Sequence, residues 1–295
     1  MPEKGSPETR KAYNSGIPAN SANPLDAVRT IIMMRSLWTA ASGMVAQQLN
    51  IDVISHNLAN VNTTGFKKSR AEFEDLIYQN MRIAGSITGT GGEQRIPTGI
   101  QVGLGVRPTT VHKFFTQGDY QNTNNPLDMA IEGDGFFQVM VNGEEMYTRA
   151  GAFKLNQDGT LVTANGYVLQ PEFTVPEETK NLVVTENGHI AALDANGEEL
   201  AAADIPLYNF INPAGLEARG RNLFNTTEAS GDAIEGVPGE ENFGTIAQGF
   251  LELSNVEVVD EMVNMIVGQR AYEMNSKAIQ TSDSMLQVAV QLKRS

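Results

Sequence analysis

Apolar residues recur with a seven-residue period near the start of the chain, from about residue 34 onward. A second set of apolar residues lies three positions after the members of the first set, and only Gln47 interrupts it. Alternating steps of three and four place both sets on one side of an α-helix, where they can pack along another helix. The sequence therefore predicts a long helix and a post-helix segment within 34–82. The residues of this predicted assembly seam are Leu37, Ala40, Met44, Ile51, Ile54, Leu58 and Val61.

The end of the chain, 250–295, shows a weaker version of the same period. One apolar line steps by seven, but the adjacent line is broken in its middle by Gln269, Ser276 and Asp283. The pattern predicts a second long helix with an incomplete apolar face. Two interpretations stay open: an antiparallel helical hairpin inside one globular protein, or terminal helices that pack together and then against other copies. The residues assigned to this seam are Val258, Met262, Met265, Tyr272, Ile279 and Leu286.

The N-terminal pattern ends in a polar tract, HNLANVNTTGFKK, at 56–68. Asparagine is a poor helix former, and a glycine at a helix end can take the left-handed conformation that closes the helix. We expect Asn57, Asn60 and Gly65 to form this stop, with Phe66 fixing the exit direction through an apolar contact. The two lysines that follow are expected to interact favourably with the C-terminal end of the helix dipole.

The middle of the chain alternates short apolar runs with dipeptides that suit tight hairpin turns. These runs predict an antiparallel β domain over 125–222. The flanking stretches 83–124 and 223–249 are rich in glycine and polar residues, and we interpret them as extended linkers. The predicted fold class is α+β, with the terminal helices forming a coiled-coil domain. Turns are predicted at Asn142-Gly143, Asp158-Gly159, Asn165-Gly166, Asn187-Gly188 and Asn196-Gly197.

Composition and charge narrow the possible functions. Residues 1–33 are rich in Pro, Ser, Asn and Ala and lack the apolar centre of a signal peptide, so they predict a disordered arm. The stretch 83–249 holds 8 basic and 22 acidic side chains, which accounts for the whole net charge of −14. This distribution argues against nucleic-acid binding, which requires a basic patch. The chain has no cysteine, which excludes disulfides and thiolate metal sites.

The sequence contains few residues that could form a catalytic or metal-binding site. The three histidines are far apart in the sequence and lack the spacing of metal ligands. The fragments at 156–159 and 194–199 are similar to parts of calcium loops, but neither has the bidentate glutamate of a complete loop. Glu132 and Asp134 could pair as acid and base, although acidic residues around a turn are expected in an acidic domain. We therefore expect no catalytic residues, no cofactor, no metal and no small-molecule substrate; a secreted ligand-binding β module is the alternative class.

Three ordered stretches carry a resemblance to a known family. Residues 36–79, 147–170 and 249–287 are similar to the blocks shared by the flagellar axial proteins, which build the rod and hook of the bacterial flagellum. Within that family, 97–108 and 116–137 most resemble the distal rod. The proximal rod and the hook stay open as nearer alternatives.

The resemblance implies a structural protein that self-assembles into a hollow helical shaft and transmits torque to the hook. The terminal helices would line the tube, and the β domain would face outward. The implied partners are further copies of the chain, proximal rod proteins, the hook protein, and the periplasmic and outer-membrane ring proteins. The implied location is the basal body of the flagellum, from the periplasm to the outer membrane.

Members of this family leave the cell through the flagellar type III export apparatus without a cleaved signal peptide. The segment FEDLI at 73–77 is similar to the short motif by which rod and hook subunits dock at that apparatus, with Phe73 and Ile77 as its apolar residues. An amphipathic turn packed on the helices is the alternative interpretation. The family normally begins at the residue equivalent to Met34, so 1–33 reflect either an upstream start codon or a lineage-specific tail.

Overall fold

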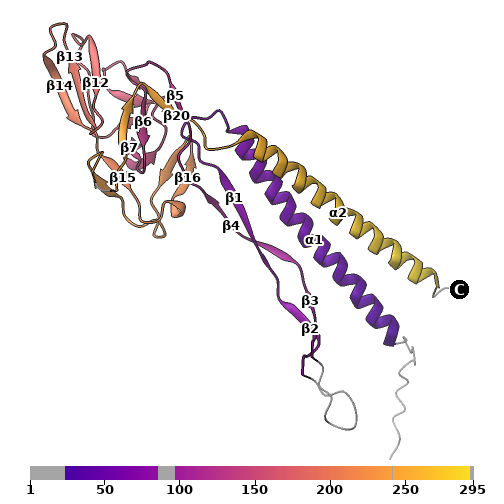
Figure 1. Cartoon of the computed structure of the whole chain (residues 1–295). Helices are drawn as coiled ribbons and strands as arrows, with labels where there is room; N and C mark the ends of the chain where they lie inside the picture. Colours follow the sequence, from indigo (N-terminus) through magenta and orange to yellow (C-terminus); the bar gives the residue numbers. More distant parts are fainter. Residues whose placement is uncertain (1–23, 86–96, 241, 293–295) are drawn as a thin grey trace, which may run out of the picture.

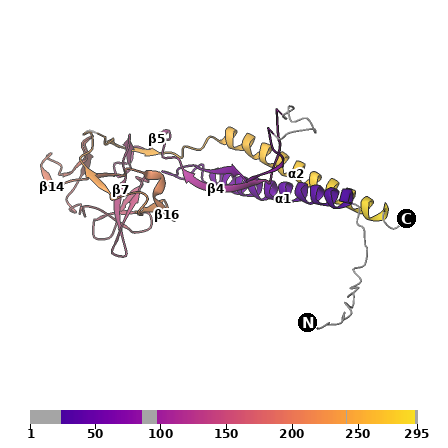
Figure 2. The ribbon, with the colours of Figure 1, turned by 90° about the horizontal axis from the view of Figure 1, so that it is seen from below.

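A computed structural model describes residues 24–85, 97–240 and 242–292. The molecule is elongated, with a β domain at one end and an arm of two helices and a β-ribbon extending from it (Figure 1). Helix α1 (Pro24–Ala59) has 36 residues and α2 (Val258–Leu292) has 35, so each is about 54 Å long. The two helices run side by side along the arm (Figure 2). This arrangement confirms the predicted α+β class.

The helix boundaries differ from the prediction at both ends of the chain. Helix α1 begins at Pro24, so the predicted disordered arm is wrong for its last ten residues, while 1–23 lie outside the described residues. Proline suits a helix start because the N–H it lacks would have no partner there. Helix α2 begins only at Val258, because 250–252 form a strand. Neither helix, over its described residues, is apolar for long enough to cross a membrane.

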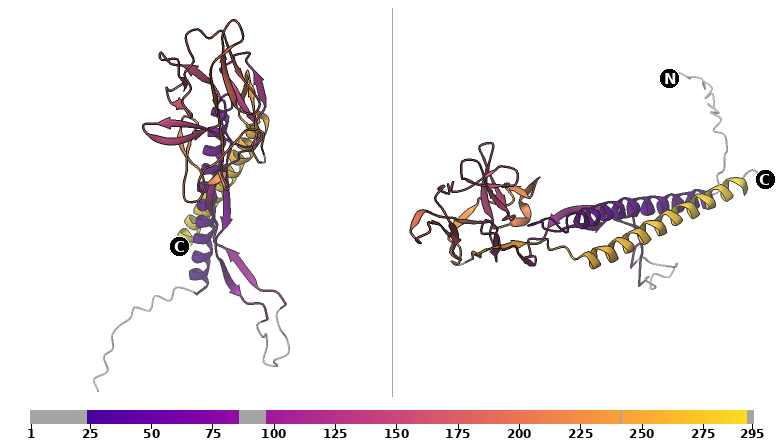
Figure 3. Two further views of the ribbon diagram at one scale, coloured as in Figure 1. Left: turned by 90° about the vertical axis from the view of Figure 1, so that its left-hand side faces the viewer. Right: turned by 90° about the horizontal axis from the view of Figure 1, so that it is seen from above.

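The segment after α1 pairs with much of the predicted first linker to form a long antiparallel ribbon. The linker prediction over 83–124 is wrong for its strands, whose β-branched residues suit a pleated ladder; 86–96 lie outside the described residues. The ribbon approaches α1 where the Val106 N–H donates to Ser42 Oγ over 3.3 Å. Its far end stands away from the helices (Figure 3). The pairs are β1 (Ser69–Asp75) with β4 (Val106–Lys113), and β2 (Tyr78–Arg82) with β3 (Ile100–Gly103).

The β domain is built entirely from antiparallel pairs. Its largest sheet has the order β16-β17-β8-β7-β11-β10-β9, beside the three-stranded sheet β12-β13-β14 and the pairs β6–β19, β5–β20 and β15–β18. A 3-10 turn, η1 (Pro213–Gly215), precedes β16. The strands are β5 (Tyr120–Asn122), β6 (Met129–Glu132), β7 (Phe137–Val141), β8 (Glu144–Thr148), β9 (Phe153–Leu155), β10 (Leu161–Thr163), β11 (Val168–Leu169), β12 (Asn181–Val184), β13 (His189–Leu193), β14 (Glu199–Asp204), β15 (Leu207–Asn209), β16 (Glu217–Gly220), β17 (Leu223–Asn225), β18 (Ile234–Gly236), β19 (Thr245–Gln248) and β20 (Phe250–Glu252).

The second predicted linker, 223–249, belongs to this domain. Its strands β17, β18 and β19 pair with β8, β15 and β6, and Leu223, Phe224 and Ile246 are buried. The linker prediction is wrong here because the strands are only three or four residues long and lie between polar turns. Two clusters fill the interior, a main apolar core and an aromatic cluster. The aromatic cluster consists of Phe136, Tyr147, Phe210, Leu216 and Phe224.

The predicted hairpin turns are confirmed. The glycine of each predicted dipeptide has a positive φ, which glycine adopts without the steric cost that a Cβ brings. The angles are 90° at Gly143, 78° at Gly159, 83° at Gly166, 83° at Gly188 and 84° at Gly197.

Candidate assembly surfaces and the neck

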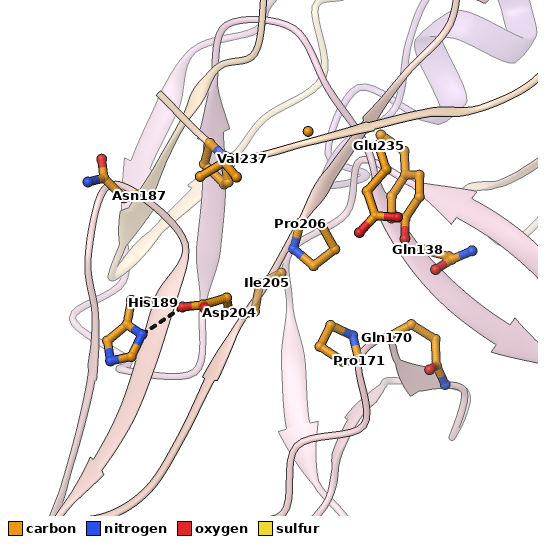
Figure 4. Close-up of a pocket in the computed structure, with 13 residues that line it drawn as sticks. Gln138, Gln170, Pro171, Asn187, His189, Asp204, Ile205, Pro206, Glu235 and Val237 are labelled. Carbon is orange, nitrogen blue, oxygen red and sulfur yellow. Dashed lines mark hydrogen bonds and ion pairs between the residues drawn. The ribbon is translucent and has the colours of Figure 1, made fainter. Parts of the chain in front are cut away.

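A pocket of about 810 Å³ lies in the β domain between the β13–β14 hairpin and strands β7, β15 and β18. His189 Nδ1 lies 2.7 Å from Asp204 Oδ1 on one side of it, opposite Gln138 and Gln170 (Figure 4). No Ser, Cys, Thr or Lys is among the described residues that line the pocket, so the His–Asp pair has no nucleophile to activate there.

The tyrosine of the pocket is unsuited to act as a base at neutral pH. Burial, together with the neighbouring carboxylate of Glu235, raises the pKa of Tyr208 to about 12. Its hydroxyl group therefore keeps its proton. Within the described residues, no group of three or more His, Asp and Glu side chains could hold a metal ion. The fragments that resemble calcium loops therefore gain no support from the structure.

Small and polar side chains form one line of contact between the two helices. At the end far from the β domain, Ser36 Oγ lies 3.0 Å from Ser282 Oγ. In the middle, α1 carries a glycine where α2 presents an asparagine: a Cβ at Gly43 would lie 2.8 Å from Asn275 Nδ2. The absence of a side chain at Gly43 thus lets the helices approach closely.

The same line of contacts continues toward the β domain. Gly268 faces α1, because a Cβ there would lie 3.2 Å from Ile51 Cγ1. At the base of the arm, Asn57 Nδ2 donates to Glu261 Oε2 over 3.3 Å. The α2 contacts at positions 261, 268, 275 and 282 are seven residues apart, and they run in the opposite direction to those on α1. The helices therefore form an antiparallel pair with a seven-residue repeat.

The predicted apolar seam flanks this polar line. Ile54 is 4% exposed, and Ala40 is also buried. The structure leaves Val258, Met262 and Tyr272 40%, 51% and 40% exposed, so their part in assembly stays a prediction. The half-buried members of the predicted seam are Leu37, Met44, Ile51 and Leu58 on α1, Met265, Ile279 and Leu286 on α2, and Val61, which lies beyond the end of α1.

Sequence reasoning missed the residues that form the contact itself on α2. The prediction rests on apolar residues, so it places the second line of the C-terminal seam at Met262, Gln269, Ser276 and Asp283. The contacting line is one residue earlier. A signal was present in the sequence, because small or polar residues also recur every seven positions at Glu261, Gly268, Asn275 and Ser282.

Large apolar side chains point away from the helix contact. Five of them on α2 are between 54% and 72% exposed in its first half and middle, and the far end of the ribbon is similarly apolar on its surface. Such a concentration of exposed apolar residues marks an interaction surface. We call the α2 residues the outer face: Val259, Val263, Ile266, Val267 and Met274. At the far end of the ribbon the exposed apolar residues include Ile77, Tyr78, Met81, Ile83 and Ile100.

The predicted helix stop is a joint between the arm and the β domain. Helix α1 ends at Ala59, six residues before Gly65, so Gly65 is not its cap. Gly65 instead has a φ of 68° in a later turn, where its N–H donates to the Glu252 carbonyl over 2.8 Å. Asn60 Nδ2 does bond the His56 carbonyl at 2.9 Å, as a residue at a helix end should. Phe66 is buried, with its ring 5.4 Å from the His56 ring, and its part in fixing the exit direction stays a prediction.

The sequence predicts that Lys67 interacts with the C-terminal end of the helix dipole. In the structure Lys67 is instead buried in an ion cluster. Its Nζ lies 2.5 Å from Glu252 Oε1, and both side chains are 1% exposed. The other carboxylate oxygen accepts from Arg149 Nε at 2.6 Å. Arg149 also donates to the Gly135 carbonyl at 2.5 Å, and Lys67 to the Thr116 carbonyl at 2.8 Å. We call Asn57, Lys67, Arg149, Glu252, Asn255 and Glu261 the neck.

The pKa values in this cluster follow from burial and charge. Burial acts to raise the pKa of Glu252, but Arg149 and Lys67 stabilise its carboxylate, and the net pKa is lowered. Burial lowers the pKa of Lys67, and the attraction of Glu252 opposes that shift. The carboxylate therefore stays ionised at neutral pH between two cations.

Acid is expected to weaken the neck. Because the pKa of Glu252 is lower in the folded chain, its ionisation stabilises the fold fully above the ordinary value of 4.5, and this contribution is lost as the pH falls through the folded value. Urea unfolding followed between about pH 6 and pH 3 should show this loss. A Glu252→Gln chain should show a shallower dependence over the same range, and an identical slope in both chains would contradict the assignment.

The predicted export motif lies on the ribbon. Phe73 is half-buried in β1 opposite Pro108, and Ile77 is 80% exposed just before β2. The alternative interpretation is an amphipathic turn packed on the helices; residues 73–75 are instead extended and paired with β4. The export role itself stays a prediction.

Comparison with known proteins agrees with this architecture. Residues 37–67 match the family described as flagella basal body rod protein, 130–192 the flagellar hook protein FlgE/F/G D1 domain, and 247–292 the flagellar basal body rod FlgEFG protein C-terminal region. The first and last matches fall on the helices and the neck. The middle match falls on the β domain.

Curated relatives extend the similarity over nearly the whole chain. The flagellar basal-body rod protein FlgG of Borreliella burgdorferi is 52% identical over 266 residues, which cover 89% of this chain and 100% of the relative. FlgG of Caulobacter vibrioides is 47% identical over 262 residues, covering 88% and 100%. FlgG of Bacillus subtilis is 40% identical over 269 residues, covering 89% and 100%. The chain therefore belongs to the FlgG family of flagellar basal-body rod proteins and is a structural subunit of the flagellum rather than an enzyme.

Proposed function

We propose that the chain is a subunit of the distal rod, where copies polymerise through their helical arms into a hollow drive shaft that transmits torque to the hook. The observation that carries the proposal is the division of α2 into two faces. Its inner face is small and polar and meets α1 within the chain, whereas its outer face is apolar and exposed. A second copy of the chain is the occupant that we assign to the outer face.

The seven-residue repeat supports a coiled-coil geometry for the arm in the polymer. Heptad spacing keeps one line of contacts facing the partner along the whole length of a helix pair. The apolar residues left outside that line can then pack against arms of other copies. Many such contacts, repeated around a tube, would hold a shaft together under torque.

The β domain is proposed to face outward from this tube. Its core is complete without the arm, and the acidic stretch 83–249 keeps its surface solvated. We propose that the periplasmic and outer-membrane ring proteins surround it, and that the proximal rod and the hook adjoin the polymer at its two ends. Export through the flagellar type III apparatus without a cleaved signal belongs to the same proposal, with Phe73 and Ile77 as the candidate docking residues.

The names of the relatives favour the distal rod over the proximal rod and the hook. The three relatives described above are rod proteins called FlgG, which supports the distal rod rather than the proximal rod or the hook. A secreted ligand-binding module would need a site in the β domain. Within the described residues, the pocket of Figure 4 contains no metal-binding cluster, and the relatives are named as rod proteins rather than as binding modules.

A charge on the outer face should block assembly without unfolding the subunit. Val267 is 62% exposed, so Val267→Asp should change the free energy of unfolding by less than about 0.5 kcal/mol. In a polymer the same charge would be buried without a partner in every copy. Expressed in a deletion strain, the variant should be made and exported but should not restore swimming.

The matched control is Val183→Asp on the β domain, where Val183 is 40% exposed. This substitution introduces the same charge far from the arm, and the strain that carries it should swim normally. If Val267→Asp also swims normally, the outer face is not an assembly surface, and the proposed arrangement of the arms is wrong.

A further inference from the structure

The helix contact does not specify its own register strongly. On α2 the contact line consists of small or polar residues, with Ile51 of α1 packed against Gly268. A shift of one heptad would place Gly43 opposite Ser282 and Asn57 opposite Gly268, which are pairs of small or polar residues, and would move Ile51 from Gly268 to Asn275. Large interlocking apolar residues normally prevent a shift of this kind in a coiled coil, and a single buried polar residue can do so instead.

The neck holds both connectors that lead into the helices. After α1, the Gly65 N–H and the Lys67 ammonium both bond Glu252, at 2.8 and 2.5 Å. Before α2, Asn255 Oδ1 accepts from the Lys68 N–H at 2.7 Å, and its Nδ2 donates to the Phe114 carbonyl at 3.0 Å. The end of α1 and the start of α2 are therefore held close together at the base of the arm.

Asn57 connects three elements at this point. Its side chain is buried, at 1% exposure, and its Nδ2 donates to the Ser69 carbonyl at 2.8 Å and to Glu261 Oε2 at 3.3 Å. Its Oδ1 accepts from the Ser69 N–H at 2.9 Å. The last turn of α1 is thereby bonded to the first turn of α2 and to the start of the ribbon. Glu261 is also buried, at 8% exposure, so a shifted register would leave its carboxylate without this donor.

We propose that Asn57 is the positioning residue that sets the register of α1 against α2. The neck fixes the alignment at the base of the arm, and the small contacts further out follow it. The larger apolar side chains are then not needed to align the two helices. The proposal concerns a single chain and holds whether or not the outer face of α2 mediates assembly.

Disulfide trapping can test the proposal, because the chain has no cysteine of its own. Ser36→Cys with Ser282→Cys reports the observed register, since the two hydroxyl oxygens lie 3.0 Å apart. Ser36→Cys with Asn275→Cys, and Ser36→Cys with Ala289→Cys, report shifts of one heptad in either direction. Cross-linking rates are measured on dilute monomer under mild oxidation. The parent chain should cross-link only in the observed register.

Adding Asn57→Ala should reduce the preference for the observed pair over the shifted pairs by at least about tenfold, because buried hydrogen bonds to a backbone and a carboxylate are lost. Asn60→Ala is the matched control: it lies three residues later, its amide bonds only the nearby His56 carbonyl and Thr63 hydroxyl and no residue of α2, and it should retain the parent preference. The thermal transition of the β domain, followed by circular dichroism, should be unchanged in both.

Two results would overturn the proposal. In the first, Asn57→Ala keeps the parent's preference for the observed pair, which would assign the register to the helix contact itself. In the second, Asn57→Ala loses all cross-links while the β domain stays folded, which would make Asn57 an anchor that holds the helices together. Selective loss of register, with cross-linking retained, is the result that the structure predicts.

Discussion

Replacing Glu252 with glutamine is expected to destabilise the protein by about 3–5 kcal/mol, the range for a buried ion pair that loses one partner. Glutamine keeps the shape of the side chain but removes the charge that balances Lys67 and Arg149. Both cations are then buried, at 1% and 4% exposure, without the carboxylate that bonds them both. Urea unfolding followed by circular dichroism measures the change. Because the cluster joins the arm to the β domain, the unfolding transition should also become less cooperative.

Glu72→Gln provides the comparison. Glu72 pairs with Arg70 on the ribbon, but the two side chains are 44% and 62% exposed. An exposed pair of this kind contributes less than about 1 kcal/mol, because water and salt screen it. If the Glu252 and Glu72 variants lose similar stability, the neck is not a buried ion cluster in solution.

Gly151→Ala is expected to be still more damaging and to prevent formation of the native β domain. A Cβ at Gly151 would lie 1.5 Å from the Met129 carbonyl oxygen, which is backbone and cannot rotate away. That part of β6 is tied to the same glycine, because the Met129 N–H donates to the Gly151 carbonyl at 3.0 Å. Relief would require separating β6 from the turn, at a cost of more than about 4 kcal/mol. The expected result is loss of the cooperative thermal transition.

The control for this variant is Gly166→Ala. Gly166 has a φ of 83° and no atom within 4 Å of its Cβ position, so the substitution meets only backbone strain. That strain costs about 1–2 kcal/mol, and the domain should still fold. A Gly151→Ala chain that is as stable as the Gly166→Ala chain would contradict the close approach of β6.

The sequence was most informative where a period is long and repeated. Heptads at both ends predicted two long helices that contact each other, and asparagine–glycine pairs predicted the hairpin turns. The linkers were misread because strands β17, β18 and β19 have three or four residues, too few to show alternation. The ribbon was misread for another reason: its strands are flanked by glycine and proline, and only pairing with the segment after α1 gives them structure.

The neck could not be read from the sequence at all. Lys67 and Glu252 are 185 residues apart, and Arg149 lies between them in a third segment. Each is an ordinary charged residue until the fold buries it. The polar contacts between the helices were readable in principle, because Glu261, Gly268, Asn275 and Ser282 keep strict heptad spacing. The prediction missed these contacts because it used apolar residues as the mark of a packed helix face.

The position of the neck has a consequence for how such chains can diversify. The backbone enters the β domain and leaves it through the same joint, so the domain is an insertion carried by a helix pair (Figure 1). The length of the inserted part does not affect the alignment of the helices, provided that the ion cluster closes. A foreign domain placed in the exposed turn at Asn196-Gly197, far from the joint, would therefore alter the outer diameter of an assembly and leave its bore unchanged.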